Sequence, residues 1–338
     1  MKRIKLRSAV ALSLSLLGMV CQTSAAHAAA DVVIYDASIL PEAPLTGKGV
    51  KVLVNGEKVR SRLGRLLLTD AARDASENLM ITRDFFQARF NRDSWDNQGS
   101  EITAIVRAGI WPLDVTGMKQ NAAWMSGFRL FVFGFGDGKG LNQFTSALDV
   151  IAHEFTHAVI ESTARLQYKG QSGALNEHLA DFFGESIQIM TGQSRPAETF
   201  IIGESTLSRE IKEQVRRKEN REVIGLRDMR NPHNGLESQP ETVAEIPEKL
   251  GPSCRASSSN DNCGVHLLSG IPNRASVLIA DGMGLEATTR IVYNAMVTQL
   301  KPTSDFRDYR AALKAECELE QRPDCQVIDR AFDQVGVY

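Results

Sequence analysis

Short apolar runs separated by turn residues predict β-strands in the first part of the chain, from Asp31 to about Gly64. The clearest case is an apolar run at residues 50–54, followed by Asn55-Gly56 and then by residues 57–60. Asn-Gly is a favoured two-residue turn between antiparallel strands, so this segment predicts a hairpin. The same patterning predicts strands at 102–106 and 128–133, and a helix at 70–90 with Thr69 as its N-cap.

Beyond about residue 150 the apolar residues recur at helical spacing, and the chain becomes mainly helical. A charge-dense segment at 211–221 is typical of a solvated helix face. Residues 231–262 are rich in Pro, Ser, Asn and Gly, which predicts a long loop. After this loop, helices are expected at 266–280, 285–300, 305–320 and 325–335. The pattern therefore predicts a β-rich lobe followed by a helical lobe.

One predicted helix, from Asp149 to Ile160, is apolar over much of its surface, as expected for a buried helix. It contains His153-Glu154-Phe155-Thr156-His157, the H-E-x-x-H pattern known from zinc peptidases. Residues four apart on a helix lie about 40° apart around its axis, so both imidazoles can bind one ion. Glu154 lies beside them, near enough to reach a water at the metal without replacing it. Two histidines that are simply satisfied in a core are the alternative interpretation.

A third metal ligand is available a short way along the chain. Glu177 lies in a second helical run that extends to Met190, and Asp181 shares its face of that helix. A zinc site of two His and one Glu leaves a fourth position open, which is typical of a catalytic site. Asp181 can accept the second ring N–H of a ligand His and fix its orientation. A solvated Glu/Asp pair is the alternative, but Phe182 and Phe183 follow directly, so this turn is not simply solvated.

The first 30 residues have the character of a secretory signal peptide. They hold four basic residues near the start, an apolar stretch at 9–20, and small residues at 26–30 that offer cleavage sites. The apolar stretch is too short for a convincing membrane span. A lipidated Cys21 is the alternative, which the preceding Gly18-Met19-Val20 does not favour.

Composition is typical of a soluble exported protein. With 338 residues and 43% hydrophobic content, the chain can bury a substantial core. Removing the first 30 residues, with four basic and no acidic side chains, changes the net charge from −2 to −6, which argues against nucleic acid or an anionic membrane as a partner. Two close cysteine pairs in an exported chain predict two disulfides, Cys254–Cys263 and Cys317–Cys325. A cysteine zinc site is the alternative, but no C-x-x-C spacing supports it.

Around these motifs the chain resembles the thermolysin family of secreted neutral zinc metallopeptidases. The resemblance runs from about residue 31 to the C-terminus and is densest between Asn121 and Ala280. It rests on the segments 153–159 (His-Glu-Phe-Thr-His-Ala-Val), 172–177 (Ser-Gly-Ala-Leu-Asn-Glu), 121–124 (Asn-Ala-Ala-Trp) and 261–266 (Asp-Asn-Cys-Gly-Val-His), and on Tyr168, Asp181 and Arg227.

The resemblance implies an α+β fold of the thermolysin type. We expect a signal peptide at residues 1–30, a β-rich N-terminal lobe at 31–150 and a helical C-terminal lobe at 151–338, with the zinc helix between the lobes at the floor of a cleft. The implied protein is a secreted endopeptidase, periplasmic or extracellular, that holds one catalytic Zn²⁺ and acts on proteins or peptides. We expect a monomer, without a nucleic-acid partner and without membrane attachment once the signal peptide is removed.

The expected mechanism uses a zinc-bound water as the nucleophile and Glu154 as the general base. The resemblance assigns Tyr168 and His266 to the stabilisation of the tetrahedral oxyanion, with Asp261 orienting His266. It assigns Asn121 and the Ala122 carbonyl to hydrogen bonds with the substrate backbone, and Arg227 to a substrate carbonyl. It also implies a pocket for the residue that supplies the new amino terminus, lined by Leu141, Phe144, Val150, Ile202 and Leu226. This pocket predicts cleavage on the amino side of bulky hydrophobic residues such as Leu, Phe or Ile.

Calcium is where the sequence departs most from this family. Thermolysin holds a pair of calcium ions beside its metal helix, whereas the corresponding positions here keep two carboxylates and lose the others. The positions are Asp149 and Glu204, which are kept, and Gln188, Thr199 and Ile201, which are not carboxylates. Calcium prefers six to eight oxygen ligands, so we expect no paired site and at most one weakly bound ion.

A second departure is the absence of an evident propeptide, since the apolar start of the first lobe at residues 32–36 follows the signal peptide almost at once. Two other functions are alternatives to the peptidase. A catalytically inactive zinc-binding adhesion or binding protein on the same fold would lack Glu154, Tyr168 or His266, and all three are present. A structural zinc protein would need a closed four-ligand shell, which the sequence does not suggest.

Overall fold

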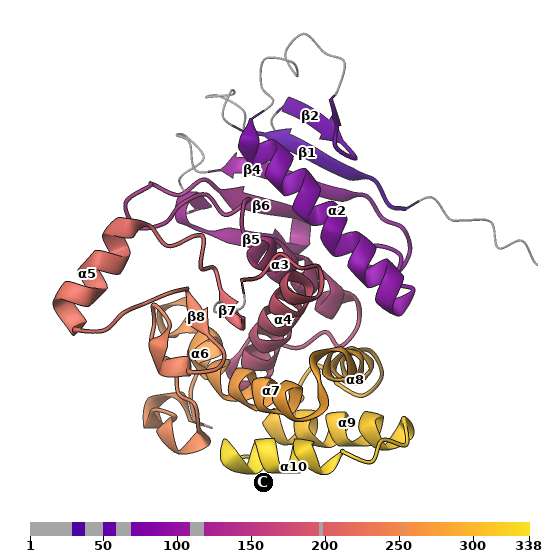
Figure 1. The fold of residues 1–338 in the computed structure, drawn as a ribbon, viewed down its shortest axis with the longest axis vertical. Helices are drawn as coiled ribbons and strands as arrows, with labels where there is room; N and C mark the ends of the chain where they lie inside the picture. Colours follow the sequence, from indigo (N-terminus) through magenta and orange to yellow (C-terminus); the bar gives the residue numbers. More distant parts are fainter. Residues whose placement is uncertain (1–28, 38–49, 59–68, 109–117, 196–198, 252) are drawn as a thin grey trace, which may run out of the picture.

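The structure is a computed structural model that describes residues 29–37, 50–58, 69–108, 118–195, 199–251 and 253–338, so almost all of the predicted signal peptide lies outside it. A sheet and helix α2 (Asp70–Phe90) form one end of the molecule, and a group of helices forms the other (Figure 1). Helices α3 (Leu148–Ser162) and α4 (Gly170–Met190) lie between these ends. The predicted α+β arrangement is confirmed.

The sheet has six strands in the order β3-β2-β1-β4-β6-β5, with β1–β4 and β4–β6 parallel and the other pairs antiparallel. The predicted hairpin is confirmed, because Asn55 and Gly56 turn the chain with φ values of 47° and 76°. Strand β5, which the sequence pattern did not predict, lies at one edge of the sheet. The strands are β1 (Val32–Asp36), β2 (Val50–Val54), β3 (Glu57–Lys58), β4 (Ile102–Ala108), β5 (Ala122–Met125) and β6 (Leu130–Gly134).

Helix α2 joins the sheet to the centre of the molecule. Its bounds agree with the prediction, and the Thr69 hydroxyl accepts a hydrogen bond from the Ala72 N–H at the first turn. Its buried face includes Leu79 and Phe86, and the Phe86 ring stacks on Phe155 of α3 with ring centroids 5.5 Å apart. The zinc-motif helix is therefore packed against α2 on the side away from its histidines.

Helix α3 is buried along nearly its whole length, as its apolar composition predicts. On its other side lies α4, which in turn contacts α6 (Asp261–Leu268). Gly173 allows this second contact, because a Cβ atom there would lie 2.4 Å from Val265 Cγ1. The close approach brings α6, with His266 in its last turn, towards α3 and α4.

The remaining elements build the helical lobe. The predicted helix at 266–280 is two helices in the structure, because α6 ends at Leu268 and α7 begins at Gly270. Both predicted disulfides, Cys254–Cys263 and Cys317–Cys325, are present. Among the helices of the described residues, none combines the length and apolar character needed to span a membrane. The elements are β7 (Ile201–Ile202), α5 (Arg209–Glu219), β8 (Arg227–Asp228), α7 (Gly270–Met283), α8 (Leu285–Thr298), α9 (Phe306–Leu319) and α10 (Gln326–Gln334).

Candidate active site

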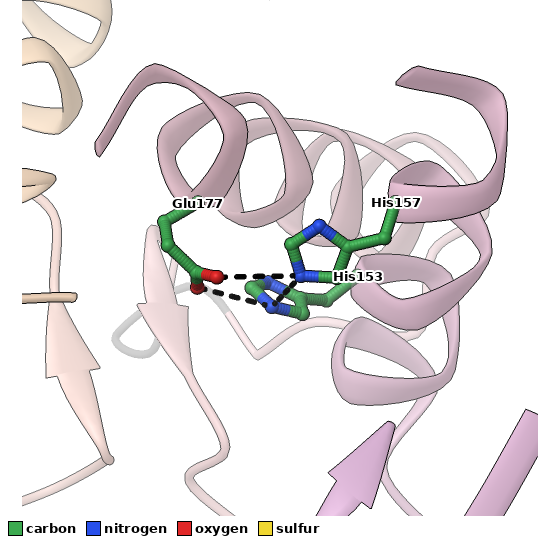
Figure 2. Close-up of side chains that lie close together, drawn as sticks. All are labelled: His153, His157 and Glu177. Atoms are coloured by element: carbon green, nitrogen blue, oxygen red, sulfur yellow. Dashed lines mark hydrogen bonds and ion pairs between the residues drawn. The ribbon is translucent and has the colours of Figure 1, made fainter. Parts of the chain in front are cut away.

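Three side chains from α3 and α4 converge on one point (Figure 2). The Nε2 atoms of His153 and His157 lie 3.0 Å apart, and the Glu177 carboxylate places Oε2 3.5 Å from the first and Oε1 3.5 Å from the second. The one-turn spacing of the two histidines places both imidazoles on the same face of α3, as the sequence predicts. Glu177 reaches them because α4 packs along α3.

The second nitrogen of each imidazole is used by a neighbour. His153 Nδ1 lies 2.9 Å from Asp181 Oδ1, and His157 Nδ1 lies 2.8 Å from Asn176 Oδ1. The Asn176 amide is oriented by its own hydrogen bond to the Leu166 carbonyl, so its oxygen faces the ring. Because an oxygen atom faces each Nδ1, both Nε2 atoms face the same point, where their lone pairs can bind a metal ion. Asn176 was not among the predicted site residues, although it directly precedes Glu177.

This arrangement fits a zinc ion. Two imidazole nitrogens and a carboxylate are typical zinc donors, and three protein ligands leave a position open for water. Glu177 Oε2 is buried without a hydrogen-bond donor among the described residues, which an ion at this point would satisfy. Neighbours that fix the tautomer of each His are a common feature of metal sites.

The electrostatics of the site favour a cation. Burial would raise the pKa of Glu177, but the positive charges of His266 and His157 hold it well below its usual range. Burial would likewise raise the pKa of Asp181, which Arg227 and His153 lower instead. The pKa of His153 is lowered by burial and raised by the neighbouring carboxylates of Asp181 and Glu177, with a net rise to about 10. Two ionised carboxylates therefore face the imidazoles and attract positive charge to them.

Glu154 lies beside the three ligands without joining them. Its Oε2 accepts a hydrogen bond of 2.9 Å from the Trp124 backbone N–H of β5, and its side chain lines the cleft. The carboxylate is thereby held in place on the side of the sheet edge. This is the position that the sequence predicts for a general base.

Tyr168 and His266 face the ligands across the cleft. The Tyr168 hydroxyl donates to Glu177 Oε1 and lies 3.2 Å from His266 Nε2. His266 Nδ1 lies 2.6 Å from Asp261 Oδ1, as the resemblance implied. The charge of Glu177 raises the pKa of His266, and burial together with Glu177 raises the pKa of Tyr168. The structure thus brings together the two predicted oxyanion donors and the residue expected to orient one of them.

A cavity of about 1010 Å³ contains the site. Most of the predicted substrate residues line it, namely Asn121, Ala122, Phe144, Val150, Ile202, Leu226 and Arg227. Leu141 is the exception: it lines an adjoining cavity of about 750 Å³, which shares Asn121, Phe144, Leu226, Arg227 and His266 with the first. The two cavities therefore adjoin along these five shared residues, beside the metal site.

Arg227 is tied to the metal site in a way that the sequence did not indicate. Its Nε and Nη2 atoms donate to the two carboxylate oxygens of Asp181 at 2.8 and 2.5 Å. Asn273 also donates to Asp181, at 2.9 Å. The partners are 46 and 92 residues away in the sequence, and helical periodicity carries no information about such contacts.

A second group of carboxylates lies at the other end of the α3–α4 contact. Oxygen atoms of Asp149, Glu185 and Glu204 all lie within 4.8 Å of one another. The sequence analysis expected Asp149 and Glu204 there with Gln188, and it missed Glu185. Gln188 accepts a hydrogen bond from the Asp149 N–H and donates one to Glu204. Burial raises the pKa of Asp149 to about 6, and burial together with Asp149 raises the pKa of Glu185 well above its usual range.

Comparison with protein families gives two adjacent matches. Residues 34–161 match the family model described as the thermolysin metallopeptidase catalytic domain, and residues 164–337 match that of the thermolysin metallopeptidase alpha-helical domain. Together they cover most of the chain.

Individual relatives agree with these matches. The chain is 32% identical over 265 residues to an extracellular elastase of Staphylococcus epidermidis, covering 78% of this chain and 46% of that protein. It is 35% identical over 273 residues to an extracellular metalloprotease of Pectobacterium carotovorum subsp. carotovorum, covering 79% and 73%. The chain thus spans about half the length of the first relative and most of the second.

A solved structure is also similar. The precursor of protealysin, a metalloproteinase from Serratia proteamaculans, superposes with a TM-score of 0.74 at 31% identity, covering 91% of this chain and 88% of that one. The similarity therefore extends through both lobes and the cleft between them.

Proposed function

Because this chain belongs to the thermolysin metallopeptidase family, we propose that it is a secreted zinc endopeptidase that cleaves on the amino side of bulky hydrophobic residues. The observation that carries the proposal is the convergence of His153, His157 and Glu177, with the carboxylate of Glu154 beside them but outside the ligand set. This combination provides both a metal site and a base. Relatives described as extracellular support export, for which residues 1–30 are the proposed signal.

The chemistry is divided between the metal and the chain. When bound by the three ligands, a zinc ion lowers the pKa of a water molecule and polarises the scissile carbonyl. Glu154, held by the Trp124 N–H, accepts the proton of the attacking water and then passes it to the leaving amine. Tyr168 and His266 donate hydrogen bonds to the oxygen that becomes negative in the transition state. Asp261 fixes the ring of His266 for this purpose.

The substrate lies along the edge of the sheet in this proposal. Among the described strands, β5 pairs with β6 alone, so its other edge can add an extended peptide as a further strand. Asn121 and the Ala122 carbonyl are the groups that hydrogen-bond the peptide backbone. Arg227, which Asp181 holds against the cavity wall, binds a substrate carbonyl.

The preference for bulky hydrophobic residues rests on the apolar part of the cavity. Phe144, Val150, Ile202 and Leu226 supply aromatic and aliphatic surface beside the metal ligands. Moving a large apolar side chain from water into such a pocket lowers the free energy of binding. Moving a charged side chain there raises it. Leu141 extends this surface into the adjoining cavity.

The test is incubation of the purified mature protein with a peptide library, with and without a zinc chelator, followed by mass spectrometry of the products. We expect chelator-sensitive cleavage before Leu, Phe or Ile. Zinc-loaded protein that leaves the library intact would refute the proposal. Chelator-sensitive cleavage without a preference would refute only the assigned pocket.

A further inference from the structure

The first turn of α6 is left-handed. Asp261, Asn262, Cys263 and Gly264 have φ values of 52°, 49°, 68° and 75°. Glycine adopts this backbone freely, but the other three residues carry side chains that disfavour it. Such a conformation persists only where surrounding contacts fix it. The contacts around this turn must therefore stabilise its left-handed backbone.

Hydrogen bonds from the preceding segment fix part of the turn. The side-chain oxygen of Asn260 accepts from the Ser257 N–H at 2.9 Å and from the Cys263 N–H at 3.1 Å, and the Asn262 N–H donates to the Ser257 carbonyl at 2.8 Å. Residues 255–259 are exposed, so water competes for these groups. These hydrogen bonds alone therefore stabilise the left-handed backbone only weakly.

A covalent contact supplements them. The disulfide Cys254–Cys263 ties the third residue of the turn to the chain nine residues earlier. Cys263 is buried and Cys254 is half-buried. Next to the disulfide, Leu250 packs over Gly264, where an added Cβ would lie 2.7 Å from Leu250 Cδ1. Water cannot compete with a covalent bond, so the disulfide is the strongest restraint on the turn.

The turn positions a residue of the active site. The Asp261 carboxylate accepts from the His266 N–H at 2.8 Å and from His266 Nδ1 at 2.6 Å. This double contact directs the opposite nitrogen, Nε2, to a point 3.2 Å from the Tyr168 hydroxyl. If the backbone at Asp261 relaxed to the right-handed region, its carboxylate would move away from the imidazole.

We propose that the Cys254–Cys263 disulfide is a positioning element for His266. By holding the left-handed turn, it keeps Asp261 against the imidazole and aims Nε2 into the cleft. The inference rests on the proposed peptidase function, since it assigns His266 a part in hydrolysis. It differs from ordinary stabilisation by a disulfide, because it requires a loss of turnover in protein that is fully folded.

The test compares three double variants of the zinc-loaded mature protein. Cys254→Ala/Cys263→Ala removes the tie, and Cys254→Ala/Cys263→Gly removes it but relieves the strain, because glycine accepts a positive φ. Cys317→Ala/Cys325→Ala is the matched control, with a sequence separation of 8 residues against 9 and neither cysteine in the walls of the two cavities. Like the first pair, it joins one buried and one half-buried cysteine.

We expect the alanine variant to lose about tenfold to a hundredfold in kcat, with a much smaller change in KM, because a misplaced oxyanion donor costs less than a missing one, which is worth about a hundredfold to a thousandfold. The glycine variant should regain most of the lost kcat. The control should keep the wild-type kcat when assayed below its melting temperature. Each variant is assayed at equal zinc content.

A spectroscopic measurement separates this inference from the proposed function. In protein with ¹⁵N-labelled histidine, the His266 Nδ1 proton that is bonded to Asp261 should give a resonance in the wild type, the glycine variant and the control, and should shift or broaden in the alanine variant. An unchanged resonance and an unchanged kcat in the alanine variant would overturn the inference, as would an equal loss of kcat in the control or no recovery with glycine. A wild-type protein without peptidase activity would refute the function, while the resonance would still test the positioning.

Discussion

At the scale of single residues, the geometry of the site depends on which atoms of each side chain contact a neighbouring residue. Asp181 shows this most clearly, because its two oxygens contact His153, Arg227 and Asn273. One carboxylate thereby orients a metal ligand and a residue of the cavity wall at the same time. The charge of Asp181 is stabilised by Arg227, which keeps the pKa of this buried carboxyl low.

A pair of substitutions separates the base from the ligands. Glu154→Gln should retain about one zinc per chain, because Glu154 is outside the ligand set, while kcat falls at least about a hundredfold through loss of the proton acceptor. Glu177→Ala should lose the zinc as well as the activity. Metal content by elemental analysis and steady-state kinetics are the measurements. Wild-type turnover in zinc-loaded Glu154→Gln would rule out this mechanism.

At the scale of elements, the sequence predicts those helices and strands that are determined by interactions between residues close together in the chain. Thr69 caps α2 and Asn55-Gly56 turns the hairpin because each acts on backbone a few residues away. Strand β5 has no alternating pattern, and it becomes a strand by pairing with β6. The sequence pattern predicts the end of a loop at Asp261, whereas the structure has a left-handed turn there, because the contacts that maintain it come from a disulfide and from Leu250.

The residues of the candidate site likewise divide into those that the sequence predicts and those that only the packing of separate elements brings together. The H-E-x-x-H motif and the Glu177/Asp181 pair follow from helical spacing, and the structure brings them together as predicted. Glu185 was missed, since it joins Asp149 and Glu204 only through the packing of α4 on α3 and the return of β7. A single sequence does not reveal which carboxylates on separate elements will share a cavity.

We expect this carboxylate group to make the α3–α4 contact sensitive to pH. Asp149 and Glu185 have raised pKa values, so their contribution to stability is fully present below the unfolded pKa near 4 and is lost as pH rises through the folded pKa, about 6 for Asp149. At neutral pH without calcium, Glu185→Gln should therefore raise Tm, by roughly 2–4 °C. The exposed Glu210→Gln is the control. A lower Tm for Glu185→Gln in zinc-loaded, calcium-free protein would contradict the prediction.

Calcium should act weakly at the same place. Three carboxylates and one amide offer one ion an incomplete shell, so millimolar calcium should raise the Tm of the zinc-loaded protein only slightly. Glu185→Gln should abolish that rise. A large calcium-dependent rise that Asp149→Ala abolishes would show a stronger or paired site.

The two disulfides should each stabilise the helical lobe modestly. Loop-closure entropy for loops this short corresponds to roughly 2–3 kcal/mol at most. Cys317→Ala/Cys325→Ala should reduce the free energy of unfolding by about this amount, with an unchanged denaturant slope. Urea titration followed by fluorescence is the measurement, and a variant as stable as the wild type would contradict it.

At the scale of the whole molecule, the two lobes share one helix. Residue 150, the proposed boundary, lies inside α3, and α3 packs against α2 on one side and α4 on the other. The cleft is therefore built at the meeting of the two lobes, with the edge strand β5 on one side and α6 on the other. Residues from both lobes line the site, so neither lobe contains all of it.

The burial of α3 has a consequence for hydrogen exchange. Amides exchange with solvent through local openings where packing is loose, and through global unfolding where it is not. We expect the amides of residues 151–160 to exchange at the rate set by global unfolding, whereas those of the exposed segment 255–259 exchange through small local openings. Deuterium uptake measured by mass spectrometry against urea concentration distinguishes the two regimes. The two histidine ligands on α3 would then keep their backbone positions through every partial opening of the surrounding chain.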